Sequence, residues 1–297
     1  MGRIDWHVHA ALLFVQLTFG AFPVVGKVVL GHLPPLAVAG LRVLVAAPLL
    51  LALAWRLERV PFPRGHLKEL ALLGFLGVFA NQVLFILGLA RTTATNAAIL
   101  MPSIPVFTVL VATVLGVERL SPRRALGVGV AVAGALVLLN PTRFSLTGGT
   151  SFGDLLILLN CLAYAAYLVL QRPLLLRLPP LTLIAWAFVF GGVGVLVVGA
   201  SSLVGSSFAA VPAAAWAGLG YIVLIPTAVN YALNTWAIRR SSAALAATYT
   251  TVQPVVAALL GMLFLAERIG LRQLLGFALI AGGLAILGRF DDRRGAP

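Results

Sequence analysis

Amide and phenol side chains recur at helical spacing inside an otherwise apolar stretch of this sequence. Asn160, Tyr164, Tyr167 and Gln171 follow one another at i, i+4, i+7 and i+11, which places all four on one face of an α-helix. Such side chains offer neutral hydrogen-bond donors and acceptors beside aromatic rings. This face is suited to binding a zwitterion or a polar neutral metabolite.

The same kinds of side chain occur in other apolar stretches. A polar group inside a bilayer is costly, so each needs a partner or a function. They either line a central cavity or bond neighbouring helices, a bond that stabilises by roughly 0.6 kcal/mol on average. Asn81 and Asn230 also fit a symmetric structural role. The cavity candidates, besides Asn160, Tyr164 and Tyr167, are Gln16, Asn81, Gln82, Asn230, Asn234, Tyr249 and Gln253, with Asn96, Ser103, Thr227 and Tyr231 in the same stretches.

Two basic residues, Lys27 and Arg42, lie within apolar stretches. Lys27 is about one turn from the end of its stretch, so its long stem can carry the ammonium to the headgroups. Arg42 lies about two turns, or roughly 10 Å, inside the next stretch, where an unpaired guanidinium is expensive. Either could meet an anionic group or stack on an aromatic ring. The alternative is structural, with Arg42 bonding backbone carbonyls or helix ends.

The acidic residues avoid the apolar stretches. All eight fall at stretch ends or in loops: Asp5, Glu58, Glu69, Glu118, Asp154, Glu267, Asp291 and Asp292. A buried Asp or Glu is the usual proton relay of a transporter, so the sequence predicts transport without one. The single cysteine, Cys161, cannot form an internal disulfide. We expect no metal and no cofactor.

Membrane helices must position these residues, because the composition excludes a soluble domain. Of 297 residues, 61% are hydrophobic and 10% charged, whereas soluble domains have about a quarter charged. A crossing needs about 20 residues, and a helix satisfies its own backbone in lipid. We expect an all-α integral membrane protein whose first stretch is a helix of the mature chain, not a signal peptide. The ten apolar stretches are 7–30, 35–55, 68–90, 94–116, 122–140, 153–171, 181–200, 213–235, 242–265 and 270–289.

The basic residues are distributed unevenly between the two sets of loops, fifteen against four. The richer set includes Arg56, Arg59, Arg172 and Arg177, and predicts that both termini are cytoplasmic. The net charge of +13 is then a topology signal held near anionic lipid headgroups. It does not indicate nucleic-acid binding.

The second half of the sequence repeats the first. Residues 81–140 and 230–289 are identical at 16 of 60 positions without a gap. Five helices per repeat is an odd number, so the second repeat must enter the membrane inverted. The sequence therefore predicts two inverted repeats, 1–145 and 146–297, with a site between them. The matched pairs include Asn81/Asn230, Arg91/Arg240, Pro105/Pro254, Glu118/Glu267, Gly127/Gly276 and Gly134/Gly283.

Pro105 and Pro254 sit at equivalent depths of the fourth and ninth stretches. Because proline lacks an amide donor and permits a bend, we interpret both as candidates for gate flexing, with a static kink as the alternative. Glu118-Arg119 and Glu267-Arg268 are interpreted as interfacial caps or salt bridges.

Several of these residues together resemble the EamA-type transporters of the drug/metabolite transporter superfamily. The resemblance rests on Gly20, Lys27, Pro34-Pro35 and Arg42, then Ala97-Ala98, Pro105, Gly116-Val117-Glu118-Arg119-Leu120, Gly127 and Gly134, then Pro254, Glu267-Arg268, Gly276 and Gly283. It covers essentially the whole chain and implies ten helices in two inverted halves, a central cavity and export of amino acids or other small metabolites. Small multidrug members carry a glutamate in the first helix, where this chain has Gln16.

The predicted function is a plasma-membrane (inner-membrane) exporter of small metabolites, working by alternating access. The alternative is an exchanger of phosphorylated sugars or nucleotide sugars that uses Lys27 and Arg42 for the anion. No cluster of nucleophile, base or metal ligands is visible, so we expect no enzyme. The expected partners are a small-molecule substrate and membrane lipid, and the sequence leaves monomer and homodimer open.

Overall fold

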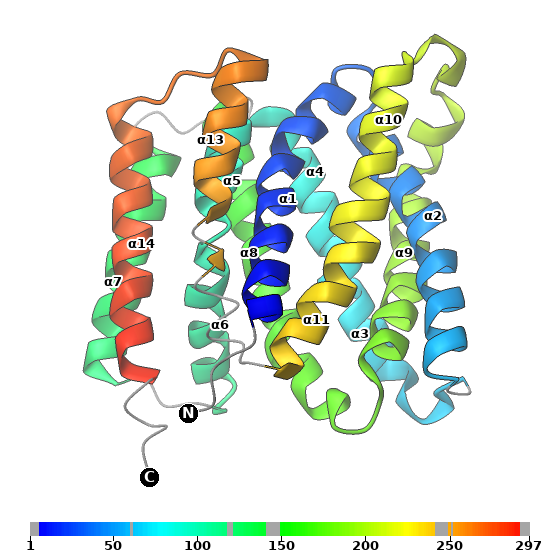
Figure 1. The fold of residues 1–297 in the computed structure, drawn as a ribbon, viewed down its shortest axis with the longest axis horizontal. Coiled ribbons are helices and arrows are strands. Elements are labelled where there is room, and N and C mark those ends of the chain that lie inside the picture. The colour runs from blue at the N-terminus through cyan, green and yellow to red at the C-terminus, as the bar shows by residue number, and fades with distance from the viewer. Residues whose placement is uncertain are drawn as a thin grey trace.

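The computed structural model describes residues 6–59, 62–117, 121–140, 149–240, 249–250 and 252–291. Over these residues the chain is helical and contains no β-strand, which confirms the all-α prediction. The helices run alongside one another as a bundle (Figure 1). The start of α1 (Trp6–Leu30) and the end of α14 (Leu271–Asp291) lie at the same face of the bundle.

Six helical segments are long and apolar enough to cross a bilayer, and four shorter apolar helices accompany them. Each predicted apolar stretch falls on one of the ten, although part of 242–265 lies outside the described residues. The long segments are α1, α2 (Pro35–Leu57), Arg64–Arg91, Ala94–Val114, α8 (Thr150–Leu175) and α9 (Pro180–Val204). The shorter helices are Arg124–Leu139, Ala213–Val229, Val252–Leu265 and Leu271–Leu287.

Three segments that the sequence presents as single helices are composite. The segment Arg64–Arg91 contains η1 (Arg64–His66), α3 (Leu67–Gly74), the π-helix η2 (Phe75–Ala80) and α4 (Asn81–Arg91). The next contains α5 (Ala94–Leu100) and α6 (Ser103–Val114). The third contains α10 (Ala213–Ile222), the π-helix η5 (Val223–Val229) and α11 (Asn230–Arg240). The remaining elements are α7 (Pro122–Leu139), the short η4 (Phe208–Ala210) and α13 (Val252–Leu265).

Proline starts helices α2 and α9. Each begins at the second proline of a Leu-Pro-Pro-Leu run, at Pro35 and at Pro180. Proline suits this position because its missing amide would have no intrahelical partner there and its φ is already helical. The two runs place α2 and α9 at corresponding points of the two halves of the sequence.

Two glutamates cap helices that are distant in sequence. The Glu58 carboxylate accepts hydrogen bonds from the amides of Leu181 (3.0 Å) and Thr182 (2.7 Å) at the start of α9. The Glu267 carboxylate accepts from the amides of Ala94 (2.7 Å) and Thr95 (3.0 Å) at the start of α5. An acceptor carrying negative charge satisfies amides that have no partner within the helix. The expected interfacial role of Glu267 thus takes the form of a cap, whereas Glu118 and Arg119 lie outside the described residues.

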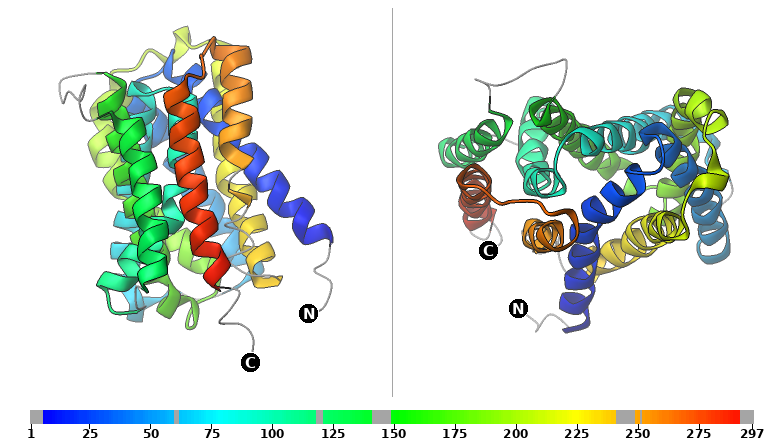
Figure 2. Two further views of the ribbon diagram at one scale, coloured as in Figure 1. Left: turned by 90° about the vertical axis from the view of Figure 1, so that its left-hand side faces the viewer. Right: turned by 90° about the horizontal axis from the view of Figure 1, so that it is seen from above.

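Glycines bring α7 and α14 close together along one edge of the bundle (Figures 1 and 2). A Cβ at Gly127 would lie 2.9 Å from the carbonyl oxygen of Gly283, and one at Gly134 would lie 2.8 Å from that of Gly276. The position number rises along α7 as it falls along α14, so the two helices are antiparallel. Gly127 and Gly276 are repeat counterparts, as are Gly134 and Gly283, so exchanging the two repeats turns one contact into the other. A two-fold axis between the helices gives this geometry. Close packing through small residues is the usual adhesion of membrane helices.

Helix α1 crosses the middle of the bundle and packs against α13 on one side and α10 and α11 on the other (Figures 1 and 2). Gly20 makes the approach to α13 possible, because a Cβ there would lie 2.7 Å from the Cβ of Val256. Helices α2 and α9 pack together at the edge opposite to α7 and α14. The polar candidates lie around α1 and around α8, which is the helix of the second repeat that corresponds to α1.

Candidate transport site around the two π-helices

The π-helices η2 and η5 occupy corresponding positions in the two halves of the chain. Each ends directly before an asparagine, η2 before Asn81 and η5 before Asn230, and these asparagines are repeat counterparts. π-helices are rare and are frequently found at functional sites. In η5 the proline Pro226 removes an amide donor, and the hydroxyl of Thr227 donates to the carbonyl of Ile222 at 3.1 Å.

Asn230 anchors the second π-helix to α1. Its side chain is fully buried, and its amide nitrogen donates to the hydroxyl of Thr18 at 2.9 Å and to the carbonyl of Val15 at 3.4 Å. Tyr221 adds a bond from its hydroxyl to the carbonyl of Thr18 at 2.7 Å. Sequence reasoning found Asn230 but missed Thr18 and Tyr221, because neither has a spacing that marks it.

Asn81 makes the corresponding contact in the first half with donor and acceptor exchanged. The amide nitrogen of Asn160 on α8 donates to the backbone carbonyl of Asn81 at 2.6 Å. The offset between Pro35 and Pro180 makes Asn160 the counterpart of Val15. The contact at the end of each π-helix therefore joins equivalent repeat positions, Asn230 with Val15 and Asn81 with Asn160. The donating asparagine side chain comes from α11 in the second half and from α8 in the first.

Arg42 joins α2 to the second π-helix. Its Nε donates to the hydroxyl of Thr227 at 3.0 Å, and its guanidinium carbon lies 5.0 Å from the centre of the Phe22 ring, which stacks on Phe85. The half-buried charge is thus balanced by a hydroxyl and an aromatic face. Lys27 is also half-buried.

The predicted tyrosine face of α8 lies against the first π-helix. Tyr164 and Tyr167 are stacked with ring centroids 5.6 Å apart. Tyr167 is buried against Gly77 of η2, where any Cβ would overlap its ring. Asn160 lies on the same face, while Gln171 is half-buried one turn further along. The i, i+4, i+7 spacing therefore marks the contact surface between α8 and η2.

Among the described residues four buried polar side-chain atoms lack a hydrogen-bond partner, and two of them belong to polar residues singled out from the sequence, in the predicted apolar stretches 68–90 and 94–116. These two are the amide oxygen of Gln82, beside Asn81, and the hydroxyl of Ser103, at the start of α6. Their side chains are 3% and 4% exposed. A buried polar atom without a partner costs about 1–3 kcal/mol, so in native proteins such atoms are commonly found facing water, an ion or a ligand.

Gln16 and Gln253 form a buried pair between α1 and α13, with the Gln253 amide nitrogen donating to the Gln16 amide oxygen. Tyr249 instead lies near the start of α1, where its hydroxyl is 2.7 Å from Nδ1 of His9. Asn234 is half-buried on α11 and bonds none of the described residues. The side chain of Tyr231 lies outside the described residues.

The prolines lie just after helix breaks. Pro105 is the third residue of α6, which begins at Ser103 after a turn at Met101-Pro102, and Pro254 is the third residue of α13. At Pro105 the break in the helix precedes the proline, and the gating role of Pro105 and Pro254 stays a prediction. A proline in a first turn replaces an amide that has no intrahelical partner.

Asp154 corrects the expectation that carboxylates lie only at stretch ends and in loops. Helix α8 begins at Thr150, so Asp154 is in its second turn, and its side chain is fully buried. Thr92 and Asn96 donate to the carboxylate, Asn96 at 3.1 and 3.3 Å. The α4–α5 junction covers this end of α8, a contact that the sequence pattern does not reveal.

Among the described residues no group of three or more His, Cys, Asp or Glu side chains could hold a metal ion. Cys161 is buried, and its thiol donates weakly to the carbonyl of Leu100 at 3.6 Å.

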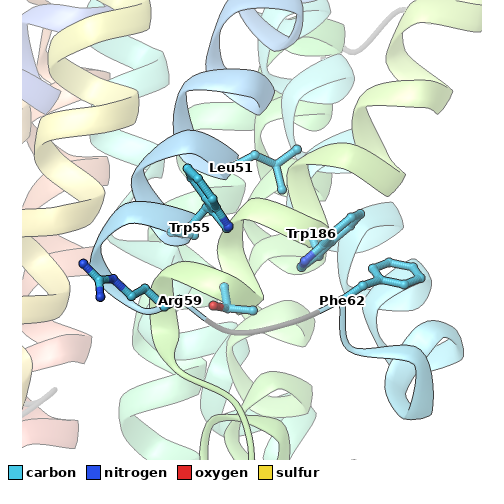
Figure 3. Close-up of a pocket in the computed structure, with 7 residues that line it drawn as sticks. Leu51, Trp55, Arg59, Phe62 and Trp186 are labelled. Carbon is cyan, nitrogen blue, oxygen red and sulfur yellow. The ribbon is translucent and has the colours of Figure 1, made fainter.

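A separate pocket of about 350 Å³ opens between the end of α2 and the start of α9 (Figure 3). Its walls are mainly aromatic and aliphatic, and it lies at the face where α1 starts, away from the π-helices. The lining residues are Leu51, Ala54, Trp55, Arg59, Phe62, Thr182 and Trp186.

These features define a polytopic all-helical membrane protein, and comparison with known proteins gives its family. The EamA-like transporter family profile matches residues 8–140 and again residues 151–289. The chain therefore belongs to the EamA-like transporter family, within the drug/metabolite transporter superfamily.

Two curated relatives and one solved structure illustrate the similarity. The chain is 27% identical to Protein WALLS ARE THIN 1 of Arabidopsis thaliana, over 97% of this chain and 84% of the relative. It is 29% identical to the uncharacterized inner membrane transporter YedA of Escherichia coli K12, over 84% and 80%. A solved crystal structure shares the fold, with a TM-score of 0.64 and 17% sequence identity. The match covers 98% of this chain and 100% of that chain.

Proposed function

We propose that this protein exports amino acids or related small metabolites by alternating access between two inverted five-helix halves, residues 1–145 and 146–297. The carrying observation is the pair of π-helices, η2 and η5, each ending at one of the repeat-related asparagines. Secondary transporters of inverted-repeat design place their sites where such interrupted helices meet. The antiparallel glycine contacts between α7 and α14 support the inverted relation.

The proposed substrate class follows from two neutral polar groups, one on α4 just after the first π-helix and one at the start of α6. The amide oxygen of Gln82 and the hydroxyl of Ser103 are buried and unpartnered among the described residues. Both are neutral, and together with the Tyr164–Tyr167 pair they suit a substrate that carries its own balanced charges. Arg42 is already held by Thr227 and Phe22, which favours the zwitterion over the phosphorylated sugars.

Gating is proposed to use the helix breaks that precede Pro105 and Pro254. At a break the backbone is already released from its ladder, so the segments on either side can tilt with little loss of hydrogen bonding. Replacement of Pro254 with Ala is expected to lower the transport rate. An unchanged rate would mean that the break is static.

Transport is proposed to run without proton coupling. Asp154 is buried, but both of its carboxylate oxygens accept hydrogen bonds, so we assign it to joining α8 to the α4–α5 junction. We further propose the plasma (inner) membrane as location, with the face that carries the start of α1 and the end of α14 in the cytoplasm.

Counterflow into liposomes holding the purified protein tests the proposal. Labelled amino acids are compared with phosphorylated sugars, with and without a pH gradient. We expect exchange of amino acids that is insensitive to pH and that is weakened in Gln82→Leu and Ser103→Ala. Sugar-phosphate exchange that is lost in Lys27→Gln or Arg42→Gln would replace the proposal with the anion exchanger. Gradient-driven uptake lost in Asp154→Asn would show proton coupling.

A further inference from the structure

The groove at the end of α2 has an apolar part and a cationic part. The apolar part, of about 350 Å³, is lined chiefly by Leu51, Trp55 and Trp186, and a second hollow of about 320 Å³ is lined by Trp55, Arg56 and Arg59. The two hollows share Trp55 and Arg59, so they adjoin. Each lies within the size range of small-molecule sites, about 300–1,000 Å³.

The charges of Arg56 and Arg59 are available to bind an anion. Glu58 lies between them in sequence, but its carboxylate accepts from the amides of Leu181 and Thr182 and from the Thr182 hydroxyl. Over the part of the chain that the structure describes, no acid lies within salt-bridge distance of Arg56 or Arg59. The groove therefore has two adjacent cations without a protein counter-ion there.

The apolar part offers surface rather than hydrogen bonds. Trp55 is 72% exposed, and the rings of Phe62 and Trp186 pack with centroids 4.5 Å apart. The hydroxyl of Thr182 is committed to Glu58. Tryptophan is enriched at membrane–water interfaces, where one side of the ring meets lipid chains.

Arg59 has a backbone conformation that glycine adopts more readily than arginine. Its φ is +51°, in the left-handed region that glycine adopts without strain. Arg59 follows the end of α2, and its amide donates to the carbonyl of Ala54 at 3.2 Å. Glycine is the usual residue at such a helix end, so Arg59 has a backbone conformation that is unfavourable for a residue with a side chain.

We propose that this groove is a binding site for an anionic phospholipid. Arg56 and Arg59 bind the headgroup phosphate, and an acyl chain lies along Leu51, Trp55 and Trp186. Charge complementarity selects an anionic over a zwitterionic headgroup, because two unpaired guanidinium groups attract net negative charge. The adjoining apolar hollow selects a lipid over a soluble phosphate.

Tryptophan quenching measures this preference. A Trp6→Phe, Trp216→Phe, Trp236→Phe variant leaves Trp55 and Trp186 as the only tryptophans. It is placed in phosphatidylcholine nanodiscs with a small fraction of either phosphatidylglycerol or phosphatidylcholine brominated in the acyl chains. We expect brominated phosphatidylglycerol to give half-maximal quenching at a roughly tenfold lower fraction, the order that two basic residues supply at an anionic surface.

Matched variants assign the preference to the groove. Arg56→Gln with Arg59→Gln should abolish most of it, whereas Arg64→Gln with Lys68→Gln removes the same charge nearby and should retain it. Arg59→Gly should lose part of the preference while easing the backbone. Equal quenching by the two lipids, or equal loss in both double variants, would overturn the proposal.

Two further measurements keep the outcome clear. Glycerol 3-phosphate at millimolar concentration should not relieve the quenching, and if it does, the site takes a soluble anion instead. If the triple Phe variant does not fold, native mass spectrometry of the unaltered chain from mixed nanodiscs replaces it. Retained phosphatidylglycerol that is lost in Arg56→Gln with Arg59→Gln supports the site, and equal retention of both lipids opposes it.

Discussion

The two π-helices have the same backbone conformation but are attached to the bundle by different kinds of contact. Around η2 the contacts are mainly steric, beside the bond from Asn160 to the carbonyl of Asn81. Gly77 receives the ring of Tyr167, and α9 approaches through Gly191, where a Cβ would lie 2.6 Å from that of Val78. Around η5 the contacts are polar, since Arg42 bonds Thr227 and Asn230 bonds Thr18. Duplication thus preserved the interrupted helix while its attachments diverged.

The difference has a mechanical consequence. Steric contacts between glycines tolerate little sliding, because interiors are close-packed and a shift of an ångström produces overlap. Hydrogen bonds from long side chains such as Arg42 can follow a moving partner or exchange it for water or substrate. We therefore infer that the η5 side moves during transport and that the η2 side is the firmer support.

The largest expected effect is steric and lies on the η2 side. Gly191→Val should destabilise the protein by about 3 kcal/mol, because its side chain meets Val78 and the backbone of Gly74. Gly220→Val, on α10 three residues before η5 begins, should cost less than about 1 kcal/mol, because a Cβ there meets nothing within 4 Å. Thermal unfolding of the purified variants in detergent measures the difference. Equal losses would end the steric distinction.

The asparagines should respond unequally. Asn230→Ala should cost about 2 kcal/mol, since it removes the hydrogen bonds of a fully buried side chain to Thr18 and Val15. Asn81→Ala should cost less than about 1 kcal/mol, because the Asn160 bond uses the backbone carbonyl, which survives. Melting temperature and counterflow rate are compared in both. A stronger effect of Asn81→Ala would show that its side chain binds substrate.

The Arg42–Thr227 contact should show a coupling energy of about 1 kcal/mol in a cycle of Arg42→Met and Thr227→Val. We expect the single variants to alter the transport rate more than the melting temperature, since this contact joins α2 to the side that moves. Additive effects would mean that the two side chains act separately.

The smallest expected effect concerns Gln16 and Gln253. Because polar pairs between membrane helices contribute roughly 0.6 kcal/mol on average, the coupling between Gln16→Leu and Gln253→Leu should be of that order. Stability measured by SDS titration across the four variants gives the value. A much larger coupling would place the pair among the principal joints between α1 and α13.

Much of the helical architecture could be predicted from the sequence. The ten apolar stretches fall on helical segments over the described residues. The i, i+4, i+7 spacing on α8 predicted that Asn160, Tyr164 and Tyr167 share one face, but not that this face packs against η2. The break at Met101-Pro102 was not predicted, since the stretch 94–116 is apolar throughout. The cap that Glu267 supplies at the start of α5 was not predicted either, because it joins residues that are distant in sequence.

The sequence by itself determined the membrane location, the helical class and the family, because hydrophobic length, repeat spacing and proline position are properties of contiguous residues. Only the tertiary structure decided which polar groups are bonded and which are open. It buried Asp154 between Thr92 and Asn96 and left Gln82 without a partner among the described residues. Hydrogen bonds and burial depend on groups that are distant along the chain, and their pairing is set when the helices pack.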